Sequence, residues 1–224
     1  ALEYSDHPKS NNGPADRIVR TRIKICGITR VEDAAAAARA GADAIGLVFY
    51  PPSPRFLGLE QARRLANAVP AFVGTVALFV NPATEEVRAV LEHVRPAALQ
   101  FHGEETPAFC GQFGVPYVKA CRVKAGVDLL KYLRPFSGAA GWLLDSHVEE
   151  YGGVGESFDW SLVPAERIRP LVLSGGLTRE NVGAAIRRVR PWAVDVSSGV
   201  ESAKGIKDAA MMAAFITEVR NANV

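Results

Sequence analysis

Several features that define large classes of proteins are missing from this chain. Its 224 residues include only three cysteines, an odd number with no Cys-x-x-Cys spacing, which argues against a disulfide framework and a zinc site. The longest apolar runs, such as residues 73–80, are far too short to span a bilayer. The N-terminus also lacks the order of charged, apolar and small residues typical of a signal peptide. We therefore expect a cytoplasmic protein with reduced thiols and no membrane partner.

Charge of one sign is not concentrated anywhere either. The chain has 26 basic and 24 acidic side chains, for a net charge of +2, without a basic block or an acidic tail. A nucleic-acid partner is therefore not expected. Residues 1–21 are polar, contain Pro8, Gly13 and Pro14, and show no periodicity, which predicts a disordered or loosely attached extension. Residues 22–224 are expected to form the fold.

Strand and helix patterns alternate from residue 22 onward. Eight strand-helix units in about 200 residues are typical of a closed parallel barrel covered by helices, so we predict a single-domain α/β TIM barrel. A doubly wound open sheet is the alternative, weakened because no Gly-x-Gly-x-x-Gly follows any strand. The expected strands are residues 22–26, 44–49, 73–79, 98–101, 117–122, 142–145, 171–174 and 193–196, and the main expected helices are residues 31–40, 59–69, 84–94, 106–112, 127–133, 178–189 and 207–221.

Cys26 stands at the end of the first predicted strand, directly before a predicted helix. Thr29 has Glu32 three residues on, which is the spacing of a helix-capping box. A helix N-terminus favours a thiolate, and Lys24, two residues earlier on the same side of the strand, could favour it as well. The alternative is that Cys26 is a small buried apolar residue. Cys110 and Cys121 are expected in the core.

Glycine and serine follow the last two predicted strands. In barrels of this kind a phosphate commonly binds to backbone N–H groups after strands seven and eight, and glycine lets the backbone approach it closely. A single such pair is more often a simple turn, but two at these positions favour a phosphate site. The residues concerned are Gly175, Gly176, Ser197, Ser198 and Gly199.

Other strand ends carry ionisable groups. A partly desolvated Asp145 could hold a proton near neutral pH and deliver it, or it could cap the next loop. Residues 146–155, which follow Asp145, are glycine-rich and suit a mobile lid. Arg55 lies in a proline-stiffened loop and could bind a carboxylate with two hydrogen bonds, although a solvated arginine is the default. Asp195 could orient a substrate hydroxyl or amine, or satisfy loop N–H groups. His102 has no carboxylate partner nearby in sequence, so we expect a structural hydrogen bond there.

The order and spacing of these motifs resemble phosphoribosylanthranilate isomerases of tryptophan biosynthesis. The similar segments include residues 24–29 (Lys-Ile-Cys-Gly-Ile-Thr), 53–56 (Ser-Pro-Arg-Phe), 99–104 (Leu-Gln-Phe-His-Gly-Glu), 173–177 (Leu-Ser-Gly-Gly-Leu) and 195–201 (Asp-Val-Ser-Ser-Gly-Val-Glu). Residues 1–21 precede the usual start of the family, and Glu156 stands where a basic or small residue is more common.

The resemblance implies an Amadori rearrangement of N-(5-phosphoribosyl)anthranilate to 1-(2-carboxyphenylamino)-1-deoxyribulose 5-phosphate, without metal or cofactor. It implies that Cys26 is the general base, Asp145 the general acid and Arg55 the partner of the anthranilate carboxylate, with the two glycine-serine loops on the phosphate. The expected partner is this small molecule, and the expected assembly is a monomer or homodimer.

Three alternatives stay open. A related phosphate-binding barrel enzyme is the nearest: indole-glycerol-phosphate synthase would need a catalytic lysine on a strand, and a histidine-pathway sugar isomerase would carry aspartate in place of Cys26. A broad-specificity isomerase of both pathways is disfavoured by the same cysteine. A non-catalytic barrel that serves as a binding module would be expected to have lost Cys26, Asp145 or the glycine-serine loops.

Overall fold

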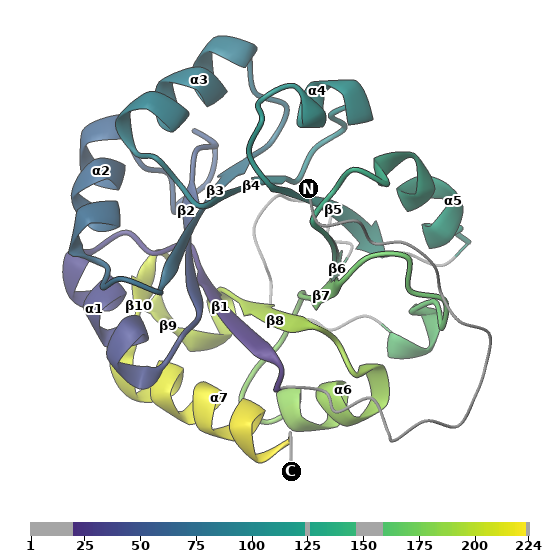
Figure 1. Cartoon of the computed structure of the whole chain (residues 1–224). Coiled ribbons are helices and arrows are strands. Elements are labelled where there is room, and N and C mark those ends of the chain that lie inside the picture. The colour runs from purple at the N-terminus through teal and green to yellow at the C-terminus, as the bar shows by residue number, and fades with distance from the viewer. Residues whose placement is uncertain (1–19, 124–125, 147–158, 223–224) are drawn as a thin grey trace.

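Eight parallel strands close into a barrel in the order of the sequence (Figure 1). The computed structural model describes residues 20–123, 126–146 and 159–222. Strand β8 pairs with β1, with Asp195 opposite Lys24, which closes the cylinder. This confirms the predicted single-domain barrel and excludes the open sheet. The strands are β1 (Arg22–Cys26), β2 (Ala44–Val48), β3 (Gly74–Phe79), β4 (Ala98–Phe101), β5 (Tyr117–Val123), β6 (Gly141–Ser146), β7 (Leu171–Leu173) and β8 (Ala193–Val196).

The helices form an outer ring around the strands (Figure 1). Their apolar faces pack on the outward side chains of the barrel; in α6, for example, Val182, Ala185, Ile186 and Val189 are buried. A large core therefore lies between strands and helices, and two small apolar clusters lie apart from it, one of them made of Cys26, Val48 and Leu78. The helices are α1 (Val31–Ala40), α2 (Leu59–Ala68), α3 (Thr84–His93), α4 (Pro107–Gly111), α5 (Leu129–Leu133), α6 (Val182–Val189) and α7 (Ala209–Asn221).

The predicted cap of the first helix is wrong. Helix α1 begins at Val31 with Arg30 at the N-cap position and no side-chain cap. The Thr29 hydroxyl donates instead to the carbonyl oxygen of Gly205. A partner 176 residues away in sequence therefore replaces the local cap that the Thr29-Glu32 spacing suggested.

Gly205 belongs to a small antiparallel hairpin that the sequence patterns did not reveal. Its strands are β9 (Glu201–Ala203) and β10 (Ile206–Lys207). The hairpin follows a short 3-10 helix, η3 (Ser198–Val200), and carries Glu201 and Lys207 toward the strand ends. Two further 3-10 helices are η1 (Arg134–Phe136) and η2 (Trp160–Leu162), and Asp159 caps the second.

Two further expectations concern the chain outside the barrel wall. Residues 1–19 of the predicted extension are not among the described residues. The same holds for residues 147–155 of the predicted lid. Arg20 is described and pairs with Asp43.

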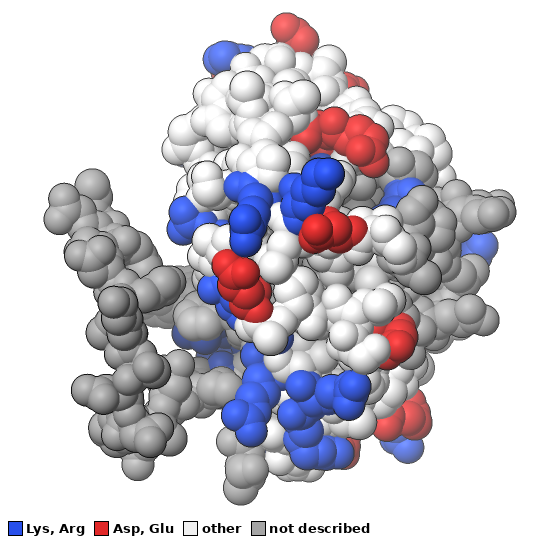
Figure 2. Space-filling view, turned by 90° about the vertical axis from the view of Figure 1, so that its right-hand side faces the viewer, with Lys and Arg blue, Asp and Glu red and all other residues white. Residues whose placement is uncertain are grey.

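Basic and acidic side chains are interspersed on the face shown in Figure 2. Within the described ranges, no helix has the length and apolar character needed to cross a membrane.

Candidate active site

The predicted site residues gather at one end of the barrel, because the carboxyl ends of parallel strands meet there. Cys26 ends β1, Asp145 is the penultimate residue of β6, and Asp195 lies in β8. The two glycine-serine loops follow β7 and β8. Residues from four different parts of the sequence therefore border one mouth.

Cys26 is buried in a space that a neighbouring glycine leaves open. A Cβ atom at Gly46, opposite it on β2, would lie 2.7 Å from the Cys26 sulfur. Burial raises the pKa of the Cys26 thiol above its ordinary value, while Lys24 and Lys207 act in the opposite direction. The site can therefore ionise this thiol only with the help of neighbouring cations.

Lys24 is the neighbour that acts most strongly to lower the pKa of the Cys26 thiol, whereas helix α1 begins only at Val31. The N–H groups of Gly27 and Ile28, which follow Cys26, both donate to the carbonyl oxygen of Gly46, at 3.0 and 3.1 Å. A Cβ at Gly46 would also lie 3.1 Å from Cε of Lys24, so the lysine side chain runs beside the Cys26 sulfur, and its charge acts to lower the thiol pKa. Although burial lowers the pKa of Lys24, Asp195 and Cys26 outweigh that effect and raise it, so the lysine stays a cation.

Asp195 is engaged with Lys24. Both of its carboxylate oxygens lie 2.9 Å from the Lys24 ammonium, and both side chains are almost fully buried. The sequence suggested that Asp195 contacts either a substrate hydroxyl or amine or the N–H groups of a loop. In the structure, both of its oxygens instead bond to Lys24. It holds the lysine beside Cys26.

Asp145 is held through both carboxylate oxygens. Oδ1 accepts the N–H of Ser146 at 2.9 Å, and Oδ2 lies 3.0 Å from Nε2 of His102. The loop after β7 backs onto this carboxyl group, because a Cβ at Gly175 would lie 2.8 Å from Oδ1. Gly175 also has a φ of 82°, a conformation that glycine adopts without strain. About a quarter of the Asp145 side chain remains exposed.

Arg55 lies next to Cys26 and is already paired. Its stem crosses Gly27, where an added Cβ would lie 2.3 Å from the arginine Cδ. Nε and Nη2 donate to the two oxygens of Glu201, each at 2.7 Å, so a substrate carboxylate has Nη1 and the second hydrogen of Nη2 left to bind. The predicted two-bond contact is therefore limited to the outer end of the guanidinium.

Glu201 joins Arg55 to Lys207. Lys207 Nζ lies 2.8 Å from Glu201 and 3.1 Å from the carbonyl oxygen of Ser197. Burial tends to raise the pKa of Glu201, but its hydrogen bonds and charge interactions with Arg55 and Lys207 bring it below the ordinary value. This buried group of three charges ties the arginine to the loop after β8. Sequence reasoning assigned no role to Glu201 or Lys207, since no local pattern shows their partners.

The two glycine-serine loops lie against each other. A Cβ at Gly199 would come within 2.0 Å of the carbonyl oxygen of Leu177, so only glycine fits there. Gly175 and Gly176 both have positive φ. Ser197 and Ser198 are partly exposed at the start of η3. The loop after β8 thus packs directly on the loop after β7 through Gly199.

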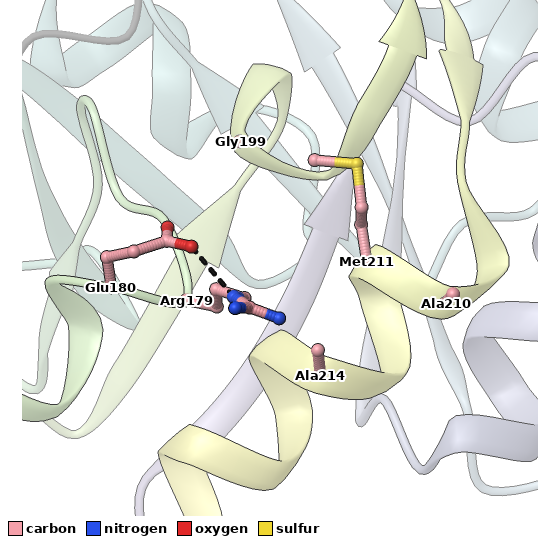
Figure 3. Close-up of a pocket in the computed structure, with 6 residues that line it drawn as sticks. All are labelled: Arg179, Glu180, Gly199, Ala210, Met211 and Ala214. Carbon is pink, nitrogen blue, oxygen red and sulfur yellow. Dashed lines mark hydrogen bonds and ion pairs between the residues drawn. The ribbon is translucent and has the colours of Figure 1, made fainter.

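A hollow of about 320 Å³ lies behind these loops, on the helix side (Figure 3). Arg179 and Glu180 at one edge pair with each other at 2.7 Å, and Met211 projects from α7 toward the Gly199 turn. Gly199 is the only predicted site residue in its lining, which also includes Ala210 and Ala214. This hollow is therefore separate from the Cys26 and Asp145 mouth.

Comparison with known proteins decides the family. Residues 23–218 match the family model described as N-(5'-phosphoribosyl)anthranilate (PRA) isomerase. The chain belongs to the phosphoribosylanthranilate isomerase family. The resemblance inferred from the sequence motifs is thereby confirmed.

Relatives support the same assignment over nearly the whole chain. The N-(5'-phosphoribosyl)anthranilate isomerase of Dechloromonas aromatica (strain RCB) is 56% identical over 205 residues, which cover 92% of this chain and 99% of that protein. The crystal structure of phosphoribosylanthranilate isomerase from Thermotoga maritima superposes with a TM-score of 0.84 at 44% identity, covering 90% of this chain and 99% of that one. A phosphoribosylanthranilate isomerase crystallised with reduced 1-(o-carboxyphenylamino)-1-deoxyribulose 5-phosphate gives a TM-score of 0.81 at 42% identity, with the same coverage of both chains.

Proposed function

We propose that this chain isomerises N-(5-phosphoribosyl)anthranilate to 1-(2-carboxyphenylamino)-1-deoxyribulose 5-phosphate by general acid–base catalysis. One observation carries the proposal: two ionisable groups lie at the same mouth of the barrel. One is the buried Cys26 thiol beside the Lys24 ammonium, and the other is the hydrogen-bonded carboxyl group of Asp145. Family membership supplies the substrate. The proposed acid is Asp145 and the proposed base is Cys26.

The first proton moves from Asp145 to the ring oxygen of the ribose. The bond between C1′ and that oxygen then breaks, its electron pair stays on oxygen, and the anthranilate nitrogen forms a C=N bond to C1′. Asp145 is left as a carboxylate, with the N–H of Ser146 on Oδ1. Such hydrogen bonds stabilise the charged form, so they favour the step that leaves the carboxylate behind.

The second proton moves from C2′ to the thiolate of Cys26. The electron pair of the C–H bond forms an enolamine, which tautomerises to the C2′ ketone of the product. A free thiol with a pKa of about 8.5 is only a few per cent ionised at neutral pH, and burial makes ionisation harder still. Lys24, held in place by Asp195, is the group we assign to stabilising this thiolate.

The remaining site residues bind the two ends of the substrate. Arg55 is proposed to bind the anthranilate carboxylate through Nη1 and Nη2, with its own position set by Glu201. The phosphate is proposed to lie on the backbone N–H groups and hydroxyls of Gly175, Gly176, Ser197, Ser198 and Gly199, where short side chains allow close approach. No metal or cofactor takes part in these steps. A monomer or homodimer and a cytoplasmic location stay predictions.

The direct test is to incubate the purified chain with freshly prepared phosphoribosylanthranilate and follow the loss of anthranilate-type fluorescence. The wild-type protein is expected to remove the signal and form the ketose product, identified by mass and by borohydride reduction. Cys26→Ala and Asp145→Asn, checked for intact folding, are expected to remove most of this turnover. A folded wild-type protein that leaves the signal unchanged would sink the proposal, and near-normal turnover by Cys26→Ala would remove the thiol from its role as base.

A further inference from the structure

His102 is a partly buried imidazole, with 14% of its side chain exposed, that the acid–base scheme above does not use. It follows β4 directly, and its Nε2 atom lies 3.0 Å from Oδ2 of Asp145. The other ring nitrogen, Nδ1, lies 3.2 Å from the side-chain nitrogen of Gln100. The imidazole therefore connects the proposed acid to a second polar side chain on β4.

The Gln100 contact determines which ring nitrogen carries hydrogen. An amide nitrogen donates hydrogen bonds and does not accept them. With the Gln100 amide oriented as in this structure, Nδ1 of His102 must accept, so the neutral ring carries its hydrogen on Nε2. That hydrogen points at Asp145, and His102 is the donor of the bond.

The loop that carries His102 is anchored on both sides. The His102 N–H donates to the carbonyl oxygen of Phe79 at 2.9 Å. The N–H of the next residue, Gly103, lies 3.0 and 3.1 Å from the two oxygens of Glu105, and its carbonyl oxygen accepts from Lys119. Lys119 and Glu105 form an ion pair at 2.8 Å that is almost completely buried.

Burying an ion pair carries a large desolvation cost, and here its hydrogen bonds go to backbone groups beside the histidine. Asn81 adds two more contacts: its N–H donates to Glu105, and its side-chain oxygen accepts the N–H of Glu104. A Cβ at Gly103 would lie 2.4 Å from that same oxygen, so Asn81 packs directly against this loop. The imidazole is presented to Asp145 by a rigid support, which is what a positioning group requires.

We propose that His102 is a positioning residue for Asp145, an inference that rests on the function proposed above. It orients the carboxyl group so that its proton faces the ribose ring oxygen. After the proton has moved and the O–H electron pair has stayed on Asp145, the Nε2–H group stabilises the carboxylate that forms. His102 itself neither gains nor loses a proton, and Gln100 keeps the ring in the donor tautomer.

Kinetics of variants separates this role from a merely structural one. His102→Ala is expected to lower kcat by about 10- to 100-fold, a part of what general acid catalysis contributes, with KM changed less than about threefold. His102→Gln, whose amide places a donor near the position of Nε2, is expected to recover at least half of the lost log kcat. His93→Ala is the matched control, since the exposed His93 side chain bonds to Ala89 within its own helix α3, and it should behave as wild type.

Two outcomes would overturn the proposal. In an Asp145→Asn background, adding His102→Ala is expected to change the residual kcat less than about threefold, because residues that act as a unit are not additive. A full 10- to 100-fold further loss would mean that His102 acts independently of Asp145. A wild-type kcat in the folded His102→Ala protein would be equally decisive against it.

Nitrogen-15 chemical shifts of the His102 ring test the geometry without any turnover. They are expected to show hydrogen on Nε2 and none on Nδ1, with the Nε2 shift moving in Asp145→Ala. Hydrogen on Nδ1 would contradict the proposal. If the wild-type protein fails to turn over phosphoribosylanthranilate, the proposed function fails, and these shifts alone then decide whether His102 donates to Asp145.

Discussion

The two sides of the barrel mouth treat their ionisable groups in opposite ways. On the β1 and β8 side, the Cys26 thiol is almost fully enclosed and has lysine ammonium groups for neighbours. On the β4 and β6 side, Asp145 keeps about a quarter of its side chain exposed and is hydrogen-bonded by an imidazole and a backbone N–H. One side supplies cations and the other supplies neutral donors.

The difference follows from what each group must do in the proposed reaction. A base has to be an anion before the substrate arrives, so a buried thiol needs a permanent positive charge beside it. An acid has to hold a proton first and become an anion later, and a permanent cation beside it would favour early loss of that proton. Neutral donors can stabilise the carboxylate without that penalty. Substitutions that exchange or remove these neighbours test the comparison.

Removing the ionisable groups themselves is expected to have the largest effect. Cys26→Ala and Asp145→Asn should each lower kcat by about 10²- to 10⁴-fold, the usual contribution of a positioned base or acid, while affinity for the product stays within about threefold. Steady-state kinetics and titration with a reduced product analogue measure the two quantities. If either variant instead raises KM with kcat unchanged, that residue binds the substrate rather than transferring a proton.

The next largest effect is expected for Lys24→Met. Since Lys24 lowers the pKa of Cys26, its loss should raise that pKa further and slow the reaction at neutral pH. Thiolate absorbance against pH, measured in protein lacking Cys110 and Cys121, reports the change. An unchanged or lower thiol pKa would show that Lys24 does not support the base.

The same variant has a predicted stability cost. Lys24→Met leaves Asp195 buried without its partner, which costs about 3–5 kcal/mol of unfolding free energy. Lys24→Met combined with Asp195→Leu is the control: it should regain most of the stability. Its thiol pKa should stay above the wild-type value because the Lys24 charge is still missing, although less so than in Lys24→Met, since Asp195 itself raises that pKa. Urea unfolding of both variants separates the structural role of the pair from its electrostatic role at Cys26.

A smaller effect is expected at the substrate carboxylate. Arg55→Lys keeps a positive charge near Glu201 but loses the planar guanidinium, which can donate two parallel hydrogen bonds. One lost charge-assisted hydrogen bond is worth about 1.5–3 kcal/mol, which predicts a KM increase of about 10- to 100-fold. The increase should disappear with a substrate made from aniline, which lacks the carboxylate. Equal KM values for wild type and variant with the anthranilate substrate would refute the assigned role.

The smallest effect is expected at the opposite end of the barrel. Asp43 accepts hydrogen bonds from Arg20 and from the N–H of Ile23. Burial opposes ionisation of Asp43, but these hydrogen bonds outweigh it and lower the pKa below the ordinary value of 3.8. Asp43→Asn should cost about 1 kcal/mol of stability at pH 7, because the Arg20 partner is largely exposed, and leave kcat unchanged.

The pH dependence of that difference has a definite sign. A lowered carboxyl pKa stabilises the folded state fully above the ordinary value and loses its contribution as the pH falls through 3.8 and then through the folded-state value. Thermal unfolding of wild type and Asp43→Asn should therefore converge below about pH 3. A difference that grows toward low pH would contradict the assigned ion pair.

The barrel was largely predictable because its signals are local. The strands at Arg22–Cys26, Ala98–Phe101 and Ala193–Val196 were expected with the observed bounds, since short alternating or apolar runs between turn residues identify them without help from distant contacts. The hairpin of β9 and β10 was missed because two- and three-residue strands have too few residues for a pattern. Thr29 was misassigned as a cap because its hydroxyl bonds to Gly205.

Local order along the chain determined which residues reach the mouth: parallel strands bring their carboxyl ends together, so Cys26, Asp145, Arg55 and the glycine-serine loops could be placed there in advance. Tertiary structure alone decided how they are paired. Lys24 and Asp195 are 171 residues apart, Arg55 and Glu201 are 146 apart, and His102 and Asp145 are 43 apart. Hydrogen bonds over such separations depend on barrel closure and on side-chain direction, and neither has a pattern that short stretches of sequence record.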